Sequence, residues 1–247
     1  MNTALSFSNL SCQIAGADIL KRLELKVPAQ SYFALAGVNG AGKSTLIKLA
    51  LDLIRPVQGG EITIFGHINQ DTRCRNQLTY LPEKFDVKKE VTGWQYLSFV
   101  FSVYQQKLDR VLIEQLCESL GLEQSRLDDK TSHYSKGMKQ KLGLISCFML
   151  DKPLIILDEP LSGLDPKARF QFKALLTKER EKNRTIFYST HMLADAEEIC
   201  DQFGILHQGR IVFQGTPQQC LKQYNQDTLE KAYMRCISEF QPDQVLG

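Results

Sequence analysis

Short apolar runs alternate with amphipathic segments along most of the chain, and this pattern predicts an α/β fold. Residues 5–10 and 19–27 alternate apolar and polar positions, as strands with one wet face do. The continuous apolar runs 32–36 and 154–157 are typical of buried strands in a parallel sheet. We therefore predict a core with a mostly parallel sheet and, from the two alternating segments, a small antiparallel sheet beside it.

The spacing of apolar residues changes to that of helices between residue 92 and about residue 131. Leu97 and Phe101 recur at helical spacing, and Gly121 stands where a second helix would end. We expect a helical insertion here, within a helical subdomain of about residues 84–150.

The last part of the chain predicts a hairpin followed by helices. Gln208-Gly209 separates two apolar segments as a short turn does, and Thr216-Pro217 is a good helix start. A final amphipathic helix is expected from Asp227 to about Ile237, within a helical tail of about residues 216–247. The alternating charges of residues 178–184 suggest a solvated helix face.

Composition limits the classes of protein to which the chain can belong. The chain has 247 residues and is 43% hydrophobic, which is enough apolar content for one sizeable core. Its net charge is +2, so it has no excess of basic residues for binding nucleic acid. No secretory segment is visible, and the apolar run 142–150 is too short to cross a bilayer. We expect a soluble domain. The seven cysteines, without a C-x-x-C pair, suggest reduced thiols.

One stretch between a predicted strand and a predicted helix has the pattern G-x-x-x-x-G-K-S of a phosphate-binding P-loop. The stretch consists of Gly37, Val38, Asn39, Gly40, Ala41, Gly42, Lys43, Ser44 and Thr45. Its glycines allow positive φ and close approach of backbone amides to an anion. Lys43 brings a charge to the terminal phosphates, and the Ser44 hydroxyl can bind Mg²⁺. An ordinary glycine-rich turn needs neither the lysine nor two hydroxyl residues after it.

Two acids follow the apolar run 154–157, at the strand end where ligands bind in open α/β sheets. Asp158 is placed to hold Mg²⁺ or its water, and Glu159 to orient and deprotonate an attacking water. His191 follows another predicted strand, 185–190. It is either a polar strand end or, as we favour, a contact to the γ-phosphate.

A second anion site is suggested around Ser135, where a helix could start. Gly137 would leave its amide unshielded, and Met138 begins one apolar helical face. Taken alone, a simple helix cap by Ser135 explains the same residues.

Together these motifs resemble the ATP-binding subunit of an ABC transporter, over nearly the whole chain. The resemblance rests on the P-loop and on four further segments: Tyr134–Gln140 for the family signature, Leu157–Pro160 for the magnesium and general-base strand, Ser162–Asp165 for the D-loop, and Ser189–His191 for the switch histidine. The helical insertion precedes the signature, as in that family.

The resemblance implies a mechanism and partners. Two such domains, expected to be identical chains, face each other head to tail and bind ATP and Mg²⁺ between them. The signature residues Ser135, Lys136, Gly137 and Met138 would then serve the partner's nucleotide. The D-loop residues Ser162, Gly163, Leu164 and Asp165 would lie at the dimer interface. Glu159 and His191 would be catalytic. The family passes the motion to an integral membrane permease on the cytoplasmic side. Phe85, Trp94 and Phe99 are candidates for docking it; the alternative, equally favoured for Trp94 and Phe99, is that they form the core of the subdomain. The tail resembles that of drug- and ion-exporting subunits.

Three positions depart from the family pattern. Glu83 stands where glutamine is usual and can still bind Mg²⁺, Lys136 replaces the first signature glycine, and Ile14 occupies a position where an aromatic residue often stacks on adenine. A non-transport ABC ATPase acting as a soluble scaffold subunit is an alternative function. A P-loop kinase or GTPase is disfavoured, since those proteins lack the Ser135–Gln140 segment and the paired acids.

Overall fold

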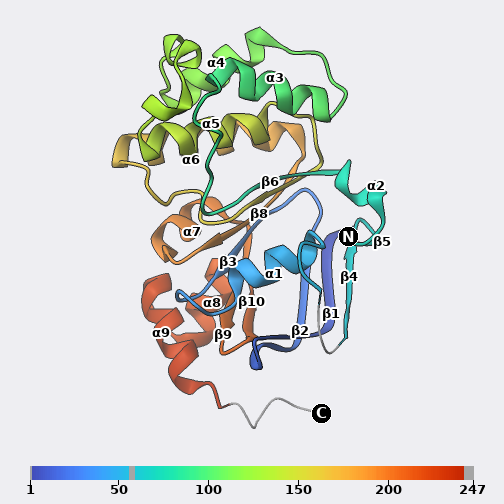
Figure 1. Ribbon diagram of the computed structural model, residues 1–247. Helices are drawn as coiled ribbons and strands as arrows, with labels where there is room; N and C mark the ends of the chain where they lie inside the picture. The colour runs from blue at the N-terminus through green and yellow to red at the C-terminus, as the bar shows by residue number, and fades with distance from the viewer. Residues whose placement is uncertain (1, 56–58, 242–247) are drawn as a thin grey trace. The chain divides into compact units, whose positions relative to one another are not determined.

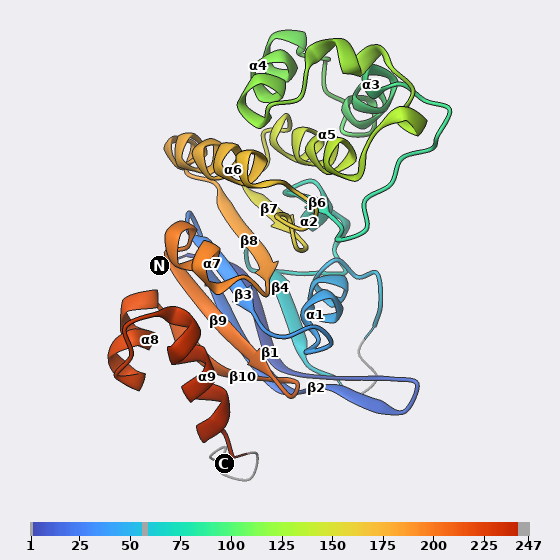
Figure 2. The same ribbon diagram turned by 90° about the vertical axis from the view of Figure 1, so that its left-hand side faces the viewer.

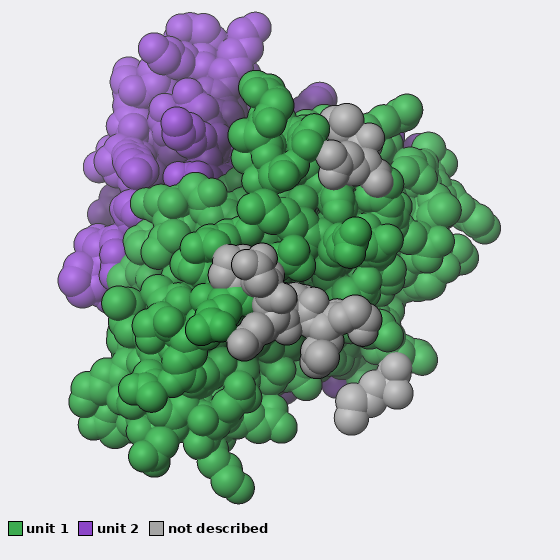
Figure 3. Space-filling view, turned by 90° about the horizontal axis from the view of Figure 1, so that it is seen from below, with its two compact units in different colours: residues 1–74, 185–247 green, residues 75–184 purple. Residues whose placement is uncertain are grey.

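The computed structural model describes residues 2–55 and 59–241. Residues 1, 56–58 and 242–247, which include the end of the expected tail 216–247, lie outside the described part. The chain divides into two compact units, coloured separately in Figure 3. Unit 1 comprises residues 1–74 and 185–247, and unit 2 comprises residues 75–184. Each unit is described by itself.

Unit 1 contains the predicted small antiparallel sheet, in the strand order β2-β1-β4-β5 (Figure 1). Its strands are β1 (Thr3–Ile14), β2 (Ala17–Pro28), β4 (Glu61–Ile64) and β5 (His67–Ile68). The alternation that predicted β1 and β2 is visible in their burial, because Leu5 and Phe7 are fully buried while Ser6 between them is partly exposed. The prediction is confirmed for these strands.

Unit 1 also contains four strands in the order β10-β9-β3-β8. The central strand β3 pairs in parallel with both β8 and β9, and all its residues are buried, as its continuous apolar run predicted. The bounds are β3 (Tyr32–Ala36), β8 (Thr185–Thr190), β9 (Gln202–His207) and β10 (Arg210–Gly215). β10 joins β9 antiparallel through Gln208 and Gly209, both at positive φ, as the predicted turn requires.

The helices of unit 1 include α1 (Lys43–Ala50), α7 (Leu193–Ile199), α8 (Pro217–Tyr224) and α9 (Leu229–Glu239). Figure 2 shows α8 and α9 beside β9 and β10. α8 begins at the predicted point, where the Thr216 side chain accepts from the Gln219 amide in a capping box. α2 (Thr72–Arg75) lies at the boundary of the units.

Unit 2 contains the parallel strands β6 (Leu78–Leu81) and β7 (Leu154–Leu157) and the predicted helical insertion. Its helices are α3 (Gly93–Val103), α4 (Arg110–Leu120), α5 (Lys136–Phe148) and α6 (Pro166–Glu179), with short 3-10 segments at Gln124–Asp128, Thr131–His133 and Arg180–Lys182. Gly121 ends α4 in the left-handed conformation, as predicted. The α/β fold class is thereby confirmed.

The charged run 178–184 differs from the expectation of a solvated face. Glu179 and Arg184 are only 3% and 6% exposed, and their side chains form an ion pair of 3.1 Å. Arg184 also donates to the Phe148 carbonyl at 3.3 Å. The expectation was wrong for these two residues, because their charges pair with each other inside the run and Arg184 also binds Phe148, which is distant in the sequence.

All seven cysteines are buried free thiols, as expected for a reduced protein. Among the described residues, no helix combines the length and the apolar character needed to cross a bilayer.

Candidate functional site

The P-loop joins the buried strand β3 to helix α1 in unit 1. Gly40 and Gly42 have φ of 83° and 106°, values that favour glycine. The Lys43 ammonium lies across the loop and donates to the carbonyl oxygens of Gly37 at 2.7 Å and Val38 at 3.3 Å. Among the described residues, no side chain caps the start of α1. No described capping side chain therefore competes with an anion at this helix start.

Close packing excludes a side chain at one of these glycines, and packing together with positive φ disfavours it at another. A Cβ on Gly37 would lie 2.7 Å from the Leu206 carbonyl oxygen of β9, and a Cβ on Gly42 would lie 3.1 Å from the Leu20 side chain of β2. The loop thus lies tightly against two strands. Val38, Asn39 and Gly40 are exposed, Ala41 and Lys43 are buried, and Ser44 and Thr45 are half-buried at the start of α1.

Strand pairing brings His191 to the start of the P-loop. Ala36 and Thr190 are register partners, and the Gly37 amide donates to the Thr190 carbonyl at 3.3 Å. His191 follows directly and is exposed. Ile14, at the end of β1, is 45% exposed.

The acids gather at the carboxyl ends of β6 and β7 in unit 2. The Asp158 amide donates to the Leu81 carbonyl at 2.8 Å, and Asp158 is 2% exposed. Burial, together with the charges of Asp158 and Glu83, raises the pKa of Tyr80 to about 12. Glu83 is exposed.

Glu159 has a strained backbone. It is 8% exposed and has a φ of 50°, which is uncommon for a residue other than glycine. Its carbonyl accepts from the Ser162 amide at 3.0 Å. Strain of this kind, on the order of 1–3 kcal/mol, is found mostly at functional positions.

The signature and the D-loop lie against each other in unit 2. Ser135 caps α5, as predicted, by accepting from the Met138 amide at 3.2 Å. A Cβ on Gly137 would lie 3.4 Å from the Gly163 carbonyl oxygen. The Lys136 chain covers Gly163, its Cε lying 2.9 Å from where a Cβ on that glycine would be. The alkyl part of the lysine is therefore directed toward the D-loop.

The rest of the D-loop is fixed by helix α6. Leu164 is 5% exposed, and Asp165 caps α6 by accepting from the Ala168 amide at 2.8 Å, as predicted. Gln140 makes a contact that the sequence motifs did not predict. Its side-chain amide donates to the Pro160 carbonyl at 3.0 Å, linking α5 to the segment after Glu159. Apart from the inclusion of Gln140 in the signature, nothing in the residue pattern indicates this contact.

Metal binding depends on the donor side chains that the chain offers. Within residues 2–55 and 59–241, no cluster of three His, Cys, Asp or Glu side chains could hold a metal ion by itself. Mg²⁺ at nucleotide sites is usually held by one or two carboxylates together with phosphates. The donors Ser44, Asp158 and Glu83 fit that chemistry.

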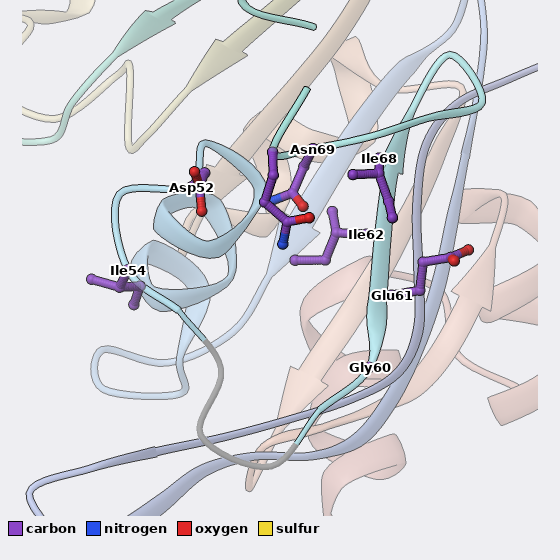
Figure 4. A pocket seen from close by; sticks show the side chains of 8 residues that line it. Asp52, Ile54, Gly60, Glu61, Ile62, Ile68 and Asn69 are labelled. Carbon is purple, nitrogen blue, oxygen red and sulfur yellow. The ribbon is translucent and has the colours of Figure 1, made fainter. Parts of the chain in front are cut away.

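A cavity of about 130 Å³ in unit 1 lies away from this machinery (Figure 4). Asp52 and Ile54, which follow the C-terminal end of α1, line it together with residues of β4 and β5. The Asn69 side chain beside it donates to the Leu49 carbonyl at 2.7 Å. The P-loop precedes the opposite end of α1, so the cavity is not part of the phosphate site.

Comparison with known proteins gives consistent results. A sequence model of the family described as "ABC transporter" matches residues 20–162. An uncharacterized ABC transporter ATP-binding protein of Synechocystis is 36% identical over 81% of this chain and 57% of its own length. The bacitracin transport ATP-binding protein BcrA of Enterococcus faecalis is 31% identical over 86% of this chain and 69% of its own.

A solved structure supports the same assignment. It is described as the ATP-binding subunit of an ABC transporter, is 34% identical, has a TM-score of 0.85, and covers 95% of this chain and 100% of its own. The chain spans about 57% of the length of the Synechocystis relative.

Proposed function

The chain belongs to the ABC transporter family, and on that premise we propose that it binds and hydrolyses ATP to drive a separate membrane permease. The observation that carries the proposal is the P-loop, in which Lys43 and the uncapped start of α1 adjoin the same glycine-rich turn. Such a turn supplies both backbone amides and a mobile cation to a phosphate chain.

Each candidate residue has a chemical role in this proposal. The P-loop amides and Lys43 bind the phosphates, and Ser44, Asp158 and Glu83 hold Mg²⁺, which supplies positive charge to them. Glu159 orients the attacking water and accepts its proton, and His191 contacts the γ-phosphate. The buried position of Asp158 and the backbone strain at Glu159 support these roles.

The proposal includes a head-to-tail dimer of identical chains. Ser135, Lys136, Gly137 and Met138 then contact the nucleotide on the partner's P-loop, and the D-loop Ser162–Asp165 lies at the interface. The packing of Gly137 and Lys136 against Gly163 supports this, since it places signature and D-loop on one continuous surface of unit 2.

The permease docks on the helical insertion, with the chain at the cytoplasmic face of the membrane. Of the three candidate aromatics, Phe99 is 64% exposed and shares the outer face of α3 with Val103, which is 59% exposed. Trp94 lies under the Arg110 guanidinium at 4.9 Å, and Phe85 packs edge-on against Tyr96 at 5.6 Å. Phe99 is therefore the strongest docking residue. The bacitracin transport function named for BcrA supports export.

Glu159→Gln tests the chemistry and the dimer together. The change removes the base but keeps the shape, so we expect ATPase activity to fall by about 10²–10⁴-fold. ATP binding should persist, and light scattering should show a dimer at saturating Mg·ATP. The matched control is Glu181→Gln, the same change at an exposed position of unit 2, which should leave both readouts unchanged. A variant that retains activity, or stays monomeric with the permease supplied, would refute the proposal.

The transport role needs a separate measurement. Co-expression with its permease should shift the chain from the cytosolic to the membrane fraction, and Phe99→Ser should reverse that shift without lowering ATP affinity. Stable association with soluble proteins alone would instead identify the chain as a scaffold subunit.

A further inference from the structure

The turn that carries Glu159 is held by two hydrogen bonds within unit 2. The Glu159 carbonyl accepts from the Ser162 amide at 3.0 Å, which closes the turn along the chain. The second bond comes from helix α5, where the Gln140 side-chain amide donates to the Pro160 carbonyl at 3.0 Å. Proline has no backbone N–H, so this carbonyl is the one backbone group that Pro160 offers for a hydrogen bond. The residue that follows Glu159 is therefore tied to a side chain 20 positions earlier.

The bond from Gln140 matters because the Glu159 backbone is strained. Its φ of 50° is uncommon for a residue with a side chain, and a strained backbone of this kind persists only where its surroundings hold it. The hydrogen bond to Pro160 is buried, so water does not readily replace the Gln140 donor. Loss of that donor would let Glu159 relax toward an ordinary φ and would turn its carboxylate away from its present position.

Helix α5 gives Gln140 a firm support. The helix packs against β6 (Figure 2). A Cβ on Gly143, about one turn after Gln140, would lie 2.5 Å from the Leu81 side chain, so helix and strand are in close contact there. The Lys139 ammonium, just before Gln140, pairs with the Asp86 carboxylate at 2.7 Å. Contacts on both sides of Gln140 thus fix its place on the helix.

Gln140 differs from the signature residues at the start of the same helix. Ser135 and Lys136 are exposed, whereas Gln140 is only 5% exposed and is not available to a partner's nucleotide. We propose that Gln140 is a positioning residue, whose side-chain amide holds Pro160 and thereby keeps the Glu159 carboxylate in its working position. The bond connects the helix that faces the partner's phosphate to this chain's own general base. The inference rests on the proposed function, in which Glu159 is that base.

The test compares two glutamines of unit 2. Gln140→Met keeps the length of the side chain and removes the N–H donor. Because the base is then misplaced, kcat for ATP hydrolysis should fall by about 10- to 100-fold while KM for ATP stays unchanged. The matched control is Gln115→Met at an exposed position of α4, which should leave both constants unchanged. Gln140→Glu replaces the donor with an acceptor and should lower kcat at least as much, which provides a second variant if Gln140→Met does not fold.

Hydrogen exchange distinguishes positioning from a merely structural role. In Gln140→Met, the Ser162 amide that closes the Glu159 turn should exchange with solvent faster than in the parent. The Met138 amide, which donates to Ser135 at the start of the same helix, should exchange as in the parent. An equal gain at both amides would show that α5 as a whole has loosened, and it would overturn the inference.

A Glu159→Gln background separates this inference from the proposed function. In that background, Gln140→Met should not lower the residual ATPase activity further, and the ATP-driven dimer should persist. Loss of the dimer would place Gln140 at the interface and contradict its role at Glu159. If Glu159→Gln is inactive but Gln140→Met keeps the kcat of the parent, the inference about Gln140 is wrong. If Glu159→Gln itself keeps the activity of the parent, the proposed function is wrong.

Discussion

Two helices begin at expected phosphate contacts, and their N-termini are built differently. α1 follows Gly42, whose φ is 106°, and no described side chain caps it. α5 follows Ser135, whose hydroxyl already accepts from the Met138 amide at 3.2 Å. At the first N-terminus no described capping side chain competes with an anion, whereas at the second the Ser135 cap already binds one of the helix amides.

This difference suggests an order of binding. The P-loop offers amides and Lys43 to nucleotide without any partner. At α5 an incoming phosphate must share Ser135 and the neighbouring amides with the helix cap, so its binding is weaker. We expect nucleotide to bind first at α1 and then recruit α5 of the second chain, and the following variants test that distinction.

The largest effect is expected from Lys43→Ala. Loss of a buried, hydrogen-bonded charge partner costs roughly 2–5 kcal/mol, or about 30- to 5,000-fold in ATP affinity. Titration of the monomer with ATP measures it. Lys136→Ala is the matched control at α5 and should leave monomer affinity unchanged. Equal losses in the two variants would show that the helices do not differ in the proposed way.

Glycine substitutions at the two helix starts should differ in stability. Gly42→Ala puts a side chain at positive φ and 3.1 Å from Leu20, and should lower the free energy of unfolding by about 1–3 kcal/mol. Gly137→Ala has ordinary contact at 3.4 Å and no positive φ, so stability should be retained or raised by up to about 1 kcal/mol. Denaturant titration measures both. A comparable loss for Gly137→Ala would contradict the description of α5.

Ser135 variants separate the cap from the phosphate contact. Ser135→Ala should lower the free energy of unfolding by about 0.5–2 kcal/mol through loss of the cap. Ser135→Asp restores a good cap but places a negative charge toward the partner's phosphate. It should therefore be stable yet fail to dimerise with ATP in a Glu159→Gln background, as seen by light scattering. Normal dimerisation of Ser135→Asp would leave Ser135 with a capping role only.

The smallest effect is expected at Lys136, where charge and packing can be separated. Lys136→Met keeps an unbranched chain over Gly163 and should retain ATP-driven dimerisation. Lys136→Gly uncovers the D-loop and should weaken it by no more than about threefold, with stability changed by about 0.5 kcal/mol. Sedimentation velocity measures the dimer. If Met and Gly weaken the dimer equally, the charge matters rather than the covering of Gly163.

The fold was largely predictable because its signals are local. Asp165 before Pro166, Thr216 before Pro217 and Gly121 after α4 each depend on one or two neighbouring dihedral angles, so the short sequence specifies them. The alternation of β1 and the continuous run of β3 likewise express burial directly.

Other features depend on residues distant in the sequence. Helical spacing placed Leu97 and Phe101 on one face of α3 and Phe99 on the opposite face, but it did not show which elements would cover the first face. Charge alternation gave the wrong environment for Glu179 and Arg184, because a buried charge is stable only beside a partner.

By itself, the sequence determined the P-loop, the acids at the end of β7 and the starts of α5 and α6, since local backbone preference defines each of them. Only the tertiary structure placed Lys136 over Gly163 and Gln140 beside Pro160. Contacts of this kind join segments that are separated in the sequence and meet only in the folded chain. The local order of residues does not specify the distances between their atoms.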